Sequence, residues 1–319
     1  MASLHRGFTS AAFLAPLLVL SAACHSNPAP STDTVARSAS LMSPVDLQAL
    51  PARPPDARIA YGEDSSQYGE LRIPAGDGPH PVVVLVHGGC FVAAYATARD
   101  LSPMGDALKD EGIASWNVEY RRVGQPGGGW PGTYLDVGRA VDHLRTLATR
   151  YELDLARVVI VGHSAGGHLA MWAAGRSRVP AGSPVHMPEP LPVRGVIDLA
   201  GPLDLSANID GYHALCRDTV ITGLLGGTPE AVPERYVHAS PMKLLPLGVP
   251  QALVWPEHED FVPRRHAEAY VRAAQRAGDA ARLIEIPDVG HFDIASPRAS
   301  PWPQVLSTIR ALLDGRLPP

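Results

Sequence analysis

The chain has 319 residues, a formal net charge of −5 and only 18% charged residues. Hydrophobic residues make up 45% of it, which is enough to build a sizeable core and too many for a disordered chain. The sequence has no basic run or stripe that could follow a phosphate backbone, so we expect no nucleic-acid partner.

The first 24 residues have the layout of a secretory signal. His5 and Arg6 precede an apolar run over residues 11–20, and small residues lead from it to Cys24. The run is too short to span a bilayer stably as a helix. Residues 20–24, LSAAC, resemble a bacterial lipobox, although the leucine stands one position further from the cysteine than usual. We therefore expect an exported protein, a periplasmic or cell-envelope lipoprotein whose membrane anchor is a lipid on Cys24, with simple cleavage of the signal as the alternative.

A linker-like segment follows the signal. Residues 26–55 are rich in Pro, Ser and Ala, a composition typical of extended linkers. The sequence thus predicts a flexible tether over residues 25–57 and a single folded domain over residues 58–319.

The first half of that domain alternates between strand and helix signals. Residues 58–62 and 69–74 favour two short strands that form an antiparallel edge. Residues 81–87 are continuously apolar, as expected for a strand of a parallel sheet with both faces covered. The pattern then predicts a helix over residues 98–111, a strand over 113–117, a glycine-rich loop over 124–132 and a helix over 134–151.

The same alternation continues to the C-terminus, with strands over residues 158–161, 193–199, 251–255 and 282–286 and helices over 264–278 and 303–313. Repeated strand-helix units predict the α/β fold class, with a mainly parallel sheet and helices on both faces. Residues 201–250 interrupt this alternation of strands and helices. They are too long for an ordinary connection between strands, so we expect a cap insertion there.

A serine lies at the turn after the strand over residues 158–161. Gly162 and Gly166 flank Ser164 in a G-x-S-x-G pattern, between a β-branched run and a helix former rich in small residues. Such a turn is sharp, and glycines on either side keep it free of Cβ atoms. We therefore expect Ser164 to be a nucleophile held at the carboxyl edge of the sheet.

A serine nucleophile needs a base and an acid that orients the base. His291 follows the last predicted strand, and an imidazole can take and return a proton near neutral pH. Asp260 is the preferred acid because it lies in the loop after the preceding strand, just before the next helix begins. Glu257 and Glu259 are the alternatives.

The sequence also offers donors for a developing oxyanion. Gly88 and Gly89 follow the strand over residues 81–87 and allow successive backbone N–H groups to point to one spot. We expect Gly89, Cys90 and Ala165 to supply these donors, and Cys90 to act through its backbone rather than as a nucleophile. An oxidising compartment would permit a Cys90–Cys216 bridge, but the spacing does not indicate whether the two are close.

We expect no metal and no cofactor. The charged run over residues 257–260 lacks the spacing of a metal motif, and adjacent loop residues seldom converge on one ion. The glycine-rich loop over residues 124–132 lacks the lysine of a phosphate loop. His163 and His168, on either side of the serine, are expected to pack or to hydrogen-bond there.

Five short stretches resemble one known family. They are HGGCF at residues 87–91, EYR at 119–121, GHSAGGHLA at 162–170, DFVP at 260–263 and GHF at 290–292. From residue 58 to residue 313 the chain resembles α/β-hydrolases of the esterase, lipase and kynurenine formamidase-like group. Phe91 stands where tryptophan is often found in that group, and residues 201–250 carry no motif that matches it.

The resemblance implies an α/β-hydrolase fold and a serine hydrolase that cleaves small-molecule carboxylic esters. Ser164 would attack the carbonyl, His291 would shuttle the proton, Asp260 would orient His291, and water would resolve the acyl-enzyme. Two alternatives remain open. One is an arylformamidase that hydrolyses an N-formyl amide, and the other is a non-catalytic envelope binding protein on a hydrolase fold.

Overall fold

The computed structural model describes residues 41–216 and 219–318. The predicted signal, the lipobox with Cys24 and the first part of the predicted tether lie outside the described residues. The described residues all belong to one compact unit.

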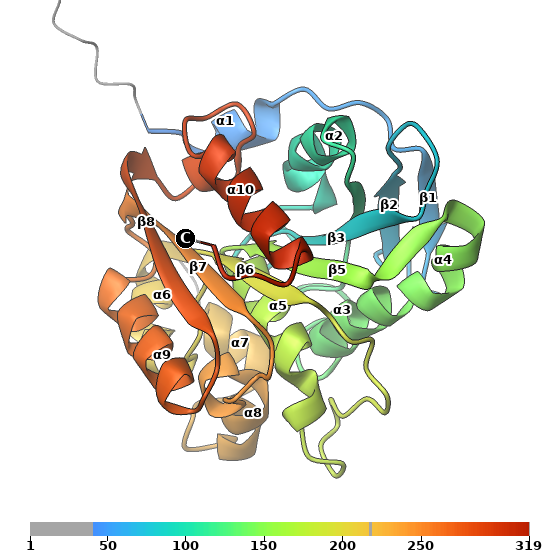
Figure 1. Cartoon of the computed structure of the whole chain (residues 1–319). Coiled ribbons are helices and arrows are strands. Elements are labelled where there is room, and N and C mark those ends of the chain that lie inside the picture. The colour runs from blue at the N-terminus through green and yellow to red at the C-terminus, as the bar shows by residue number, and fades with distance from the viewer. Residues whose placement is uncertain (1–40, 217–218, 319) are drawn as a thin grey trace, which may run out of the picture. The chain divides into compact units, whose positions relative to one another are not determined.

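An eight-stranded sheet forms the centre of this unit, in the order β1-β2-β4-β3-β5-β6-β7-β8 (Figure 1). The two edge strands β1 and β2 pair antiparallel, and β2 pairs antiparallel with β4. All pairs from β4 to β8 are parallel. The strands are β1 (Ala57–Ala60), β2 (Tyr68–Arg72), β3 (His80–Val86), β4 (Ala114–Val118), β5 (Leu153–His163), β6 (Gly195–Leu199), β7 (Gln251–His258) and β8 (Ala281–Gly290).

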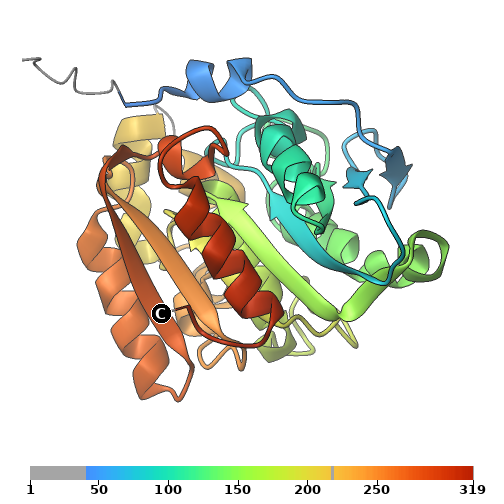
Figure 2. The ribbon, with the colours of Figure 1, turned by 45° about the horizontal axis from the view of Figure 1, so that its top comes forward.

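Helices cover both faces of the sheet, which confirms the predicted α/β class. On one face α2 (Ser102–Asp110) packs against β4, and α10 (Trp302–Leu313) packs against β5 and β6; both lie in front of the sheet in Figures 1 and 2. On the other face α5 (Ala165–Gly175) packs against β5 and β6, with α3 (Gly132–Asp142) beside it, and α9 (Arg264–Arg276) packs against β7 and β8. The sheet and its helices form the α/β-hydrolase fold that the resemblance implies.

The remaining helices are short. They are the α-helices α1 (Pro44–Ala49), α4 (Leu144–Tyr151), α6 (Ile209–Cys216), α7 (Val220–Leu225) and α8 (Pro233–Ala239), and the 3-10 helices η1 (Ala98–Leu101), η2 (Arg176–Arg178), η3 (Ser206–Asn208), η4 (Pro241–Lys243) and η5 (Asp293–Ala295).

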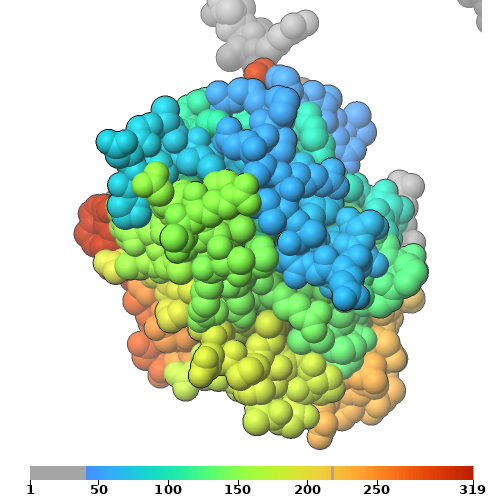
Figure 3. Space-filling view, turned by 90° about the vertical axis from the view of Figure 1, so that its right-hand side faces the viewer, coloured from blue at the N-terminus to red at the C-terminus, as the bar shows by residue number. Residues whose placement is uncertain are grey.

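The core strands are apolar because both of their faces are covered. The five residues of β3 from Val82 to Val86 are all inaccessible to solvent, as are residues 158–161 of β5. Strand β1, at the edge, alternates between half-buried and exposed residues. Figure 3 looks onto this edge, where the blue residues that include β1 form the surface beside the green residues around α4.

The predicted tether extends too far into the domain. Residues 44–49 form helix α1, whose N-cap Ser43 accepts from the backbone of Asp46 while the carboxylate of Asp46 accepts from the backbone of Ser43. Leu47 of this helix is buried. The ordered unit thus begins well before residue 58, and Ser43 followed by a proline at the first helical position was the start signal in the sequence.

The predicted cap is the helical insertion between β6 and β7. It contains η3, α6, α7, α8 and η4. Of these elements, α6 reaches the serine turn, because the hydroxyl of Tyr212 lies 3.1 Å from Oγ of Ser164. The backbones of α8 and α7 have other partners: the indole of Trp172 donates to the carbonyl oxygen of His238, and the backbone N–H of Trp130 donates to that of Leu224.

Candidate active site

Ser164 lies at a strained turn between β5 and α5. Its backbone has φ 55° and ψ −123°, a conformation that costs free energy in a residue with a side chain. A Cβ at Gly162 would lie 2.0 Å from the carbonyl oxygen of Gly166, and one at Gly166 would lie 2.0 Å from that of Val86. The two glycines are therefore required for the turn, as the sequence predicted, and the turn places Ser164 at the end of the central strand.

The acid that pairs with His291 is Glu259, not Asp260. The Nδ1–H of His291 donates to Oε2 of Glu259 across 2.7 Å, and the Glu259 side chain is 2% exposed. Asp260 is exposed. The prediction was wrong because β7 extends through His258, so that the first residue after the strand is Glu259.

The backbone of the following turn holds the Glu259 carboxylate. Its second oxygen, Oε1, accepts from the N–H groups of Phe261 at 2.7 Å and Val262 at 3.1 Å. The ring of Phe261 stacks on that of His291, with centroids 4.3 Å apart. The carboxylate and the imidazole are thus both fixed, and the Nδ1 tautomer leaves Nε2 of His291 as a proton acceptor.

The two histidines beside the serine have structural partners. Nε2 of His163 is 2.9 Å from the carbonyl oxygen of His291 and donates to it, which ties the serine turn to the histidine loop. His168 lies between the hydroxyl of Tyr134 and the carbonyl oxygen of Pro202. Burial lowers the pKa of His163 to about 3 and that of His168 to about 4, so both are neutral at physiological pH. The expectation that they pack and hydrogen-bond is confirmed.

The loop after β3 turns sharply beside the serine. Gly89, Cys90 and Phe91 all have positive φ, and a Cβ on Gly88 would lie 2.9 Å from the carbonyl oxygen of His163 and 3.1 Å from Cβ of Ser164. The backbone of this loop therefore passes directly against the serine turn, which only glycine permits.

Two backbone N–H groups of this loop have no competing acceptor among the described residues. Those of Gly89 and Cys90 make no hydrogen bond within the part of the chain that the structure describes. The N–H of Ala165, the first residue of α5, has no acceptor inside its own helix. These are the three donors that the sequence predicted for an oxyanion, and each remains a prediction until a bound carbonyl is placed beside it.

A buried network fixes the start of this loop. Nε2 of His87 lies 3.2 Å from the carboxylate of Glu119, which also pairs with Arg122 at 2.8 Å and accepts from the backbone N–H of Ala98. The Tyr120 ring stacks on His87, and its hydroxyl donates to the His87 carbonyl oxygen. Burial alone would raise the pKa of Glu119, but the charges of His87 and Arg122 lower it overall.

A disulfide connects the loop to the cap. Cys90 is bonded to Cys216, the last residue of α6, at a sequence separation of 126. The sequence alone did not decide whether this bridge forms, because residues so far apart in the chain carry no local pattern that indicates contact. The hydroxyl of Tyr95 donates to the carbonyl oxygen of Cys216 and supports the same junction.

A cavity of about 380 Å³ opens at Ser164 and His291. Its wall is mostly apolar and comes from α1, the loop after β3, the end of α6 and the histidine loop; the lining includes Leu47, Leu101, Leu215, Phe261 and Phe292. The contribution of α1 could not be expected from a tether. The size of the cavity is within the range of small-molecule sites, and its wall suits an apolar substrate part.

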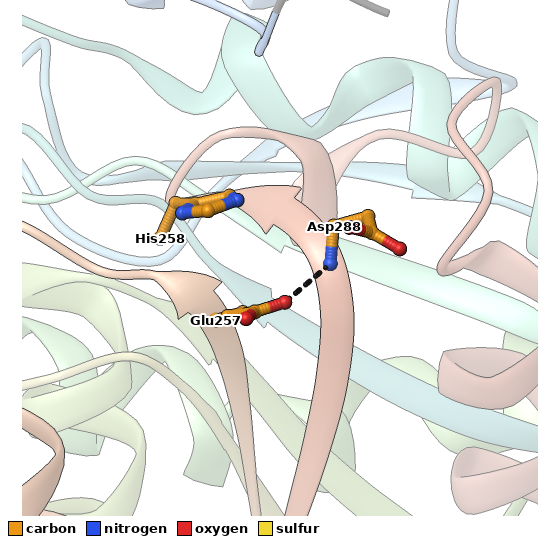
Figure 4. A group of neighbouring side chains, drawn as sticks. All are labelled: Glu257, His258 and Asp288. Atoms are coloured by element: carbon orange, nitrogen blue, oxygen red, sulfur yellow. Dashed lines mark hydrogen bonds between the residues drawn. The ribbon is translucent and has the colours of Figure 1, made fainter. Parts of the chain in front are cut away.

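Polar side chains also converge at the ends of β7 and β8, outside this cavity. Figure 4 shows Glu257 and His258 next to Asp288. The ring nitrogen or carboxylate oxygen that each could offer to a metal ion lies within 4.8 Å of the other two. All three residues are exposed, and the carboxylate of Glu257 already accepts from the backbone N–H of Asp288 at 2.9 Å. Neither Ser164 nor His291 belongs to this group, so we assign it no role in the chemistry of the site.

Within the described ranges, no helix combines the length and the apolar composition needed to cross a bilayer.

The chain matches a known protein family over most of the fold. The BD-FAE family model covers residues 71–272, more than half of the chain and including the serine turn and the Glu259 loop. The chain belongs to the BD-FAE family. This family match confirms the expected relationship to α/β-hydrolases of the esterase type.

This BD-FAE family member also resembles named proteins. The chain is 27% identical to Esterase LipC of Mycobacterium tuberculosis. The match covers 74% of this chain and only about 60% of the length of LipC. Among solved structures it is similar to a bacterial heroin esterase, with a TM-score of 0.65, 23% identity and coverage of 85% of this chain and 87% of the other. A truncated carbohydrate esterase from gut microbiota gives a TM-score of 0.67 at 20% identity, with coverage of 83% and 98%. At these identities the structures show the fold alone.

Proposed function

We propose that the protein is a carboxylic ester hydrolase that acts through an acyl-enzyme on Ser164. One observation carries the proposal: the buried Glu259–His291 pair and the strained Ser164 turn meet at the same cavity. The esterase names of relatives such as LipC support the same reaction class.

In the proposed first step, Oγ of Ser164 attacks the ester carbonyl and Nε2 of His291 takes its proton. Glu259 holds the ring through Nδ1 and stabilises the imidazolium that forms. His291 then returns the proton to the leaving alkoxide, and the alcohol departs from the acyl-enzyme. Water then attacks the carbonyl carbon of the acyl-enzyme while His291 takes its proton. His291 returns the proton to Oγ of Ser164 as the carboxylic acid leaves.

The oxyanion of each tetrahedral intermediate would be stabilised by the backbone N–H groups of Gly89, Cys90 and Ala165. Fixed donors of this kind need no reorganisation when charge develops, and one donor contributes on the order of 100- to 1,000-fold in rate. The buried network on His87 and Glu119 would hold the loop in the required shape.

The cavity favours small esters with an apolar part. Its volume of about 380 Å³ and its lining by Leu47, Leu215 and Phe292 suit a short or medium acyl chain or a compact alcohol. We therefore expect turnover of p-nitrophenyl acetate and butyrate and a decline for long-chain esters.

The proposal is tested with the purified protein, a series of p-nitrophenyl esters, N-formylkynurenine and a fluorophosphonate probe. Ester turnover and labelling should both be lost in Ser164→Ala and retained in Ser206→Ala, a change at an exposed serine. Preferred turnover of N-formylkynurenine would instead indicate an arylformamidase. A folded protein that neither reacts with the probe nor turns over a substrate would contradict both enzymatic functions and favour a binding protein.

We also propose that the protein works outside the cytoplasm, as the signal-like sequence over residues 5–24 suggests. The Cys90–Cys216 bridge supports this because such bonds persist in oxidising compartments. Fractionation and mass spectrometry of the native protein test it. A soluble cytoplasmic protein that retains Met1 would contradict export, and an unlipidated Cys24 would contradict anchoring.

A further inference from the structure

Tyr212 brings a side-chain hydroxyl to the nucleophile from the cap. It lies in the middle of α6, is inaccessible to solvent, and its hydroxyl oxygen is 3.1 Å from Oγ of Ser164. None of the roles in the proposed mechanism uses this hydroxyl. Buried hydroxyls are paired, and the partner of this one is the reacting oxygen itself, so its position calls for a chemical explanation.

Helix α6 reaches the serine from the side of the donor loop. Cys216, one helical turn after Tyr212, is bonded covalently to Cys90 of that loop. The ring of Phe91, the next loop residue, packs against the ring of Tyr212 with centroids 6.1 Å apart. The base, by contrast, is held by Glu259 at the end of β7. Through the bridge and the Phe91 contact, the helix that carries Tyr212 is thus connected to the loop that would supply the oxyanion donors.

The Tyr212 hydroxyl keeps its proton at working pH. Burial raises the pKa of Tyr212 well above its ordinary value, and the charge of Glu259 acts in the same direction. The group is therefore a permanent hydrogen-bond donor and cannot serve as a general base near neutral pH.

We propose that the hydroxyl of Tyr212 donates a further hydrogen bond to the oxyanion of the tetrahedral intermediate. The inference rests on the proposed ester hydrolysis at Ser164. When Oγ bonds to the carbonyl carbon, the oxygen that becomes negative is attached to that same carbon. A donor already 3.1 Å from Oγ then needs only a small rotation to reach the oxyanion. The proton stays on Tyr212 throughout, and no bond to the tyrosine forms or breaks.

The proposal is tested by Tyr212→Phe, which removes the hydroxyl and keeps the ring. We expect kcat for p-nitrophenyl butyrate to fall on the order of 100-fold, with KM changed by less than about threefold, because the lost bond forms only in the transition state. Tyr236→Phe is the matched control, since it removes a buried cap hydroxyl that donates to the carbonyl oxygen of Gly227. It should leave kcat unchanged.

A thionoester separates an oxyanion donor from a residue that only holds the resting serine. Sulfur accepts hydrogen bonds weakly, so the penalty of Tyr212→Phe on the matched thionoester should shrink to less than about tenfold. Equal penalties on the ester and the thionoester would overturn the proposal. So would an unchanged kcat for the ester.

Two further measurements keep the outcomes distinct. If Tyr212→Phe is unstable, 3-fluorotyrosine at position 212 keeps both ring and hydroxyl and should retain kcat within about threefold, and a loss as large as that expected for Phe would overturn the role. Ser164→Ala separates the two proposals. If it is inactive while Tyr212→Phe is fully active, only the tyrosine role is wrong. If Ser164→Ala still turns over the ester, the proposed function itself is wrong.

Discussion

Glu259 and His291 form a buried pair in which the Nδ1–H of His291 donates across 2.7 Å to a side chain that is 2% exposed. The next residue, Asp260, is exposed. Two neighbouring acids in one loop thus have very different environments, and Glu259 is the one that holds the imidazole of His291 in the tautomer that leaves Nε2 as a proton acceptor.

This relationship predicts opposite results for two conservative changes. Glu259→Gln should lower kcat on the order of 10,000-fold, because an amide can stabilise the wrong tautomer and cannot stabilise the imidazolium. Asp260→Asn should change kcat by less than about threefold, as expected of an exposed residue outside the pair. Steady-state kinetics with p-nitrophenyl butyrate measure both. A larger loss in Asp260→Asn than in Glu259→Gln would mean that Asp260 is the acid after all.

Sequence alone predicted the parts of the site that local patterns define. The alternation of strands and helices indicated the sheet, and Ser164 and His291 each follow a strand and have a glycine within two residues. The acid was missed because residues 257–260 offer three carboxylates, and the choice depends on the residue at which β7 ends. A shift of one residue turns a side chain to the other face of a strand.

The other omissions are long-range contacts. The bridge between Cys90 and Cys216 joins residues 126 apart, and the contact between Tyr212 and Ser164 depends on how the cap folds back. Neither the bridge nor the tyrosine contact produces a periodic or local sequence pattern that could predict it. The helix at residues 44–49, by contrast, does have a capping signal at Ser43, which the proline-rich composition around it obscured.

The disulfide should contribute strongly to stability. In the chain-entropy model, closing a loop of about 100 residues stabilises a fold by about 4.7 kcal/mol and a longer loop by slightly more, and removing a native bridge typically costs about 2 to 5 kcal/mol. Cys90→Ser combined with Cys216→Ser should therefore lower the free energy of unfolding in urea by about 2 to 5 kcal/mol. The wild-type protein in reductant should match the double variant, and a midpoint that does not respond to reductant would contradict the prediction.

The serine turn should tolerate no side chain at Gly166. In Gly166→Ala the new Cβ would lie 2.0 Å from the carbonyl oxygen of Val86, and backbone cannot move aside as a flexible side chain can. We expect a loss of about 3 kcal/mol or more in the free energy of unfolding, or no folded protein. Gly182→Ala is the control, because a Cβ there meets nothing within 4 Å. Similar stability of the two variants would show that the turn is less constrained than its geometry indicates.

A buried acid beneath the serine turn should make stability depend on pH. Asp198 lies in β6 with one oxygen accepting from the N–H of Gly201 at 2.8 Å, while its other oxygen has no partner within the described residues. Burial raises the pKa of Asp198 from its usual value of 3.8 to about 8. Between these two values the folded protein holds a proton that the unfolded chain has lost, so the free energy of unfolding contributed by this group falls as the pH rises.

Asp198→Asn removes this dependence because an amide does not titrate. The free energy of unfolding of the variant minus that of the wild type should therefore increase by up to about 1.4 kcal/mol per pH unit between about pH 5 and pH 8 and then level off. The buried His163 and His168, with pKa values of about 3 and about 4, act in the opposite direction below about pH 6.5. They are common to both proteins and cancel in the difference. Urea unfolding at several pH values across this range measures the slope, and a difference that stays constant would mean that Asp198 is ionised in the folded protein.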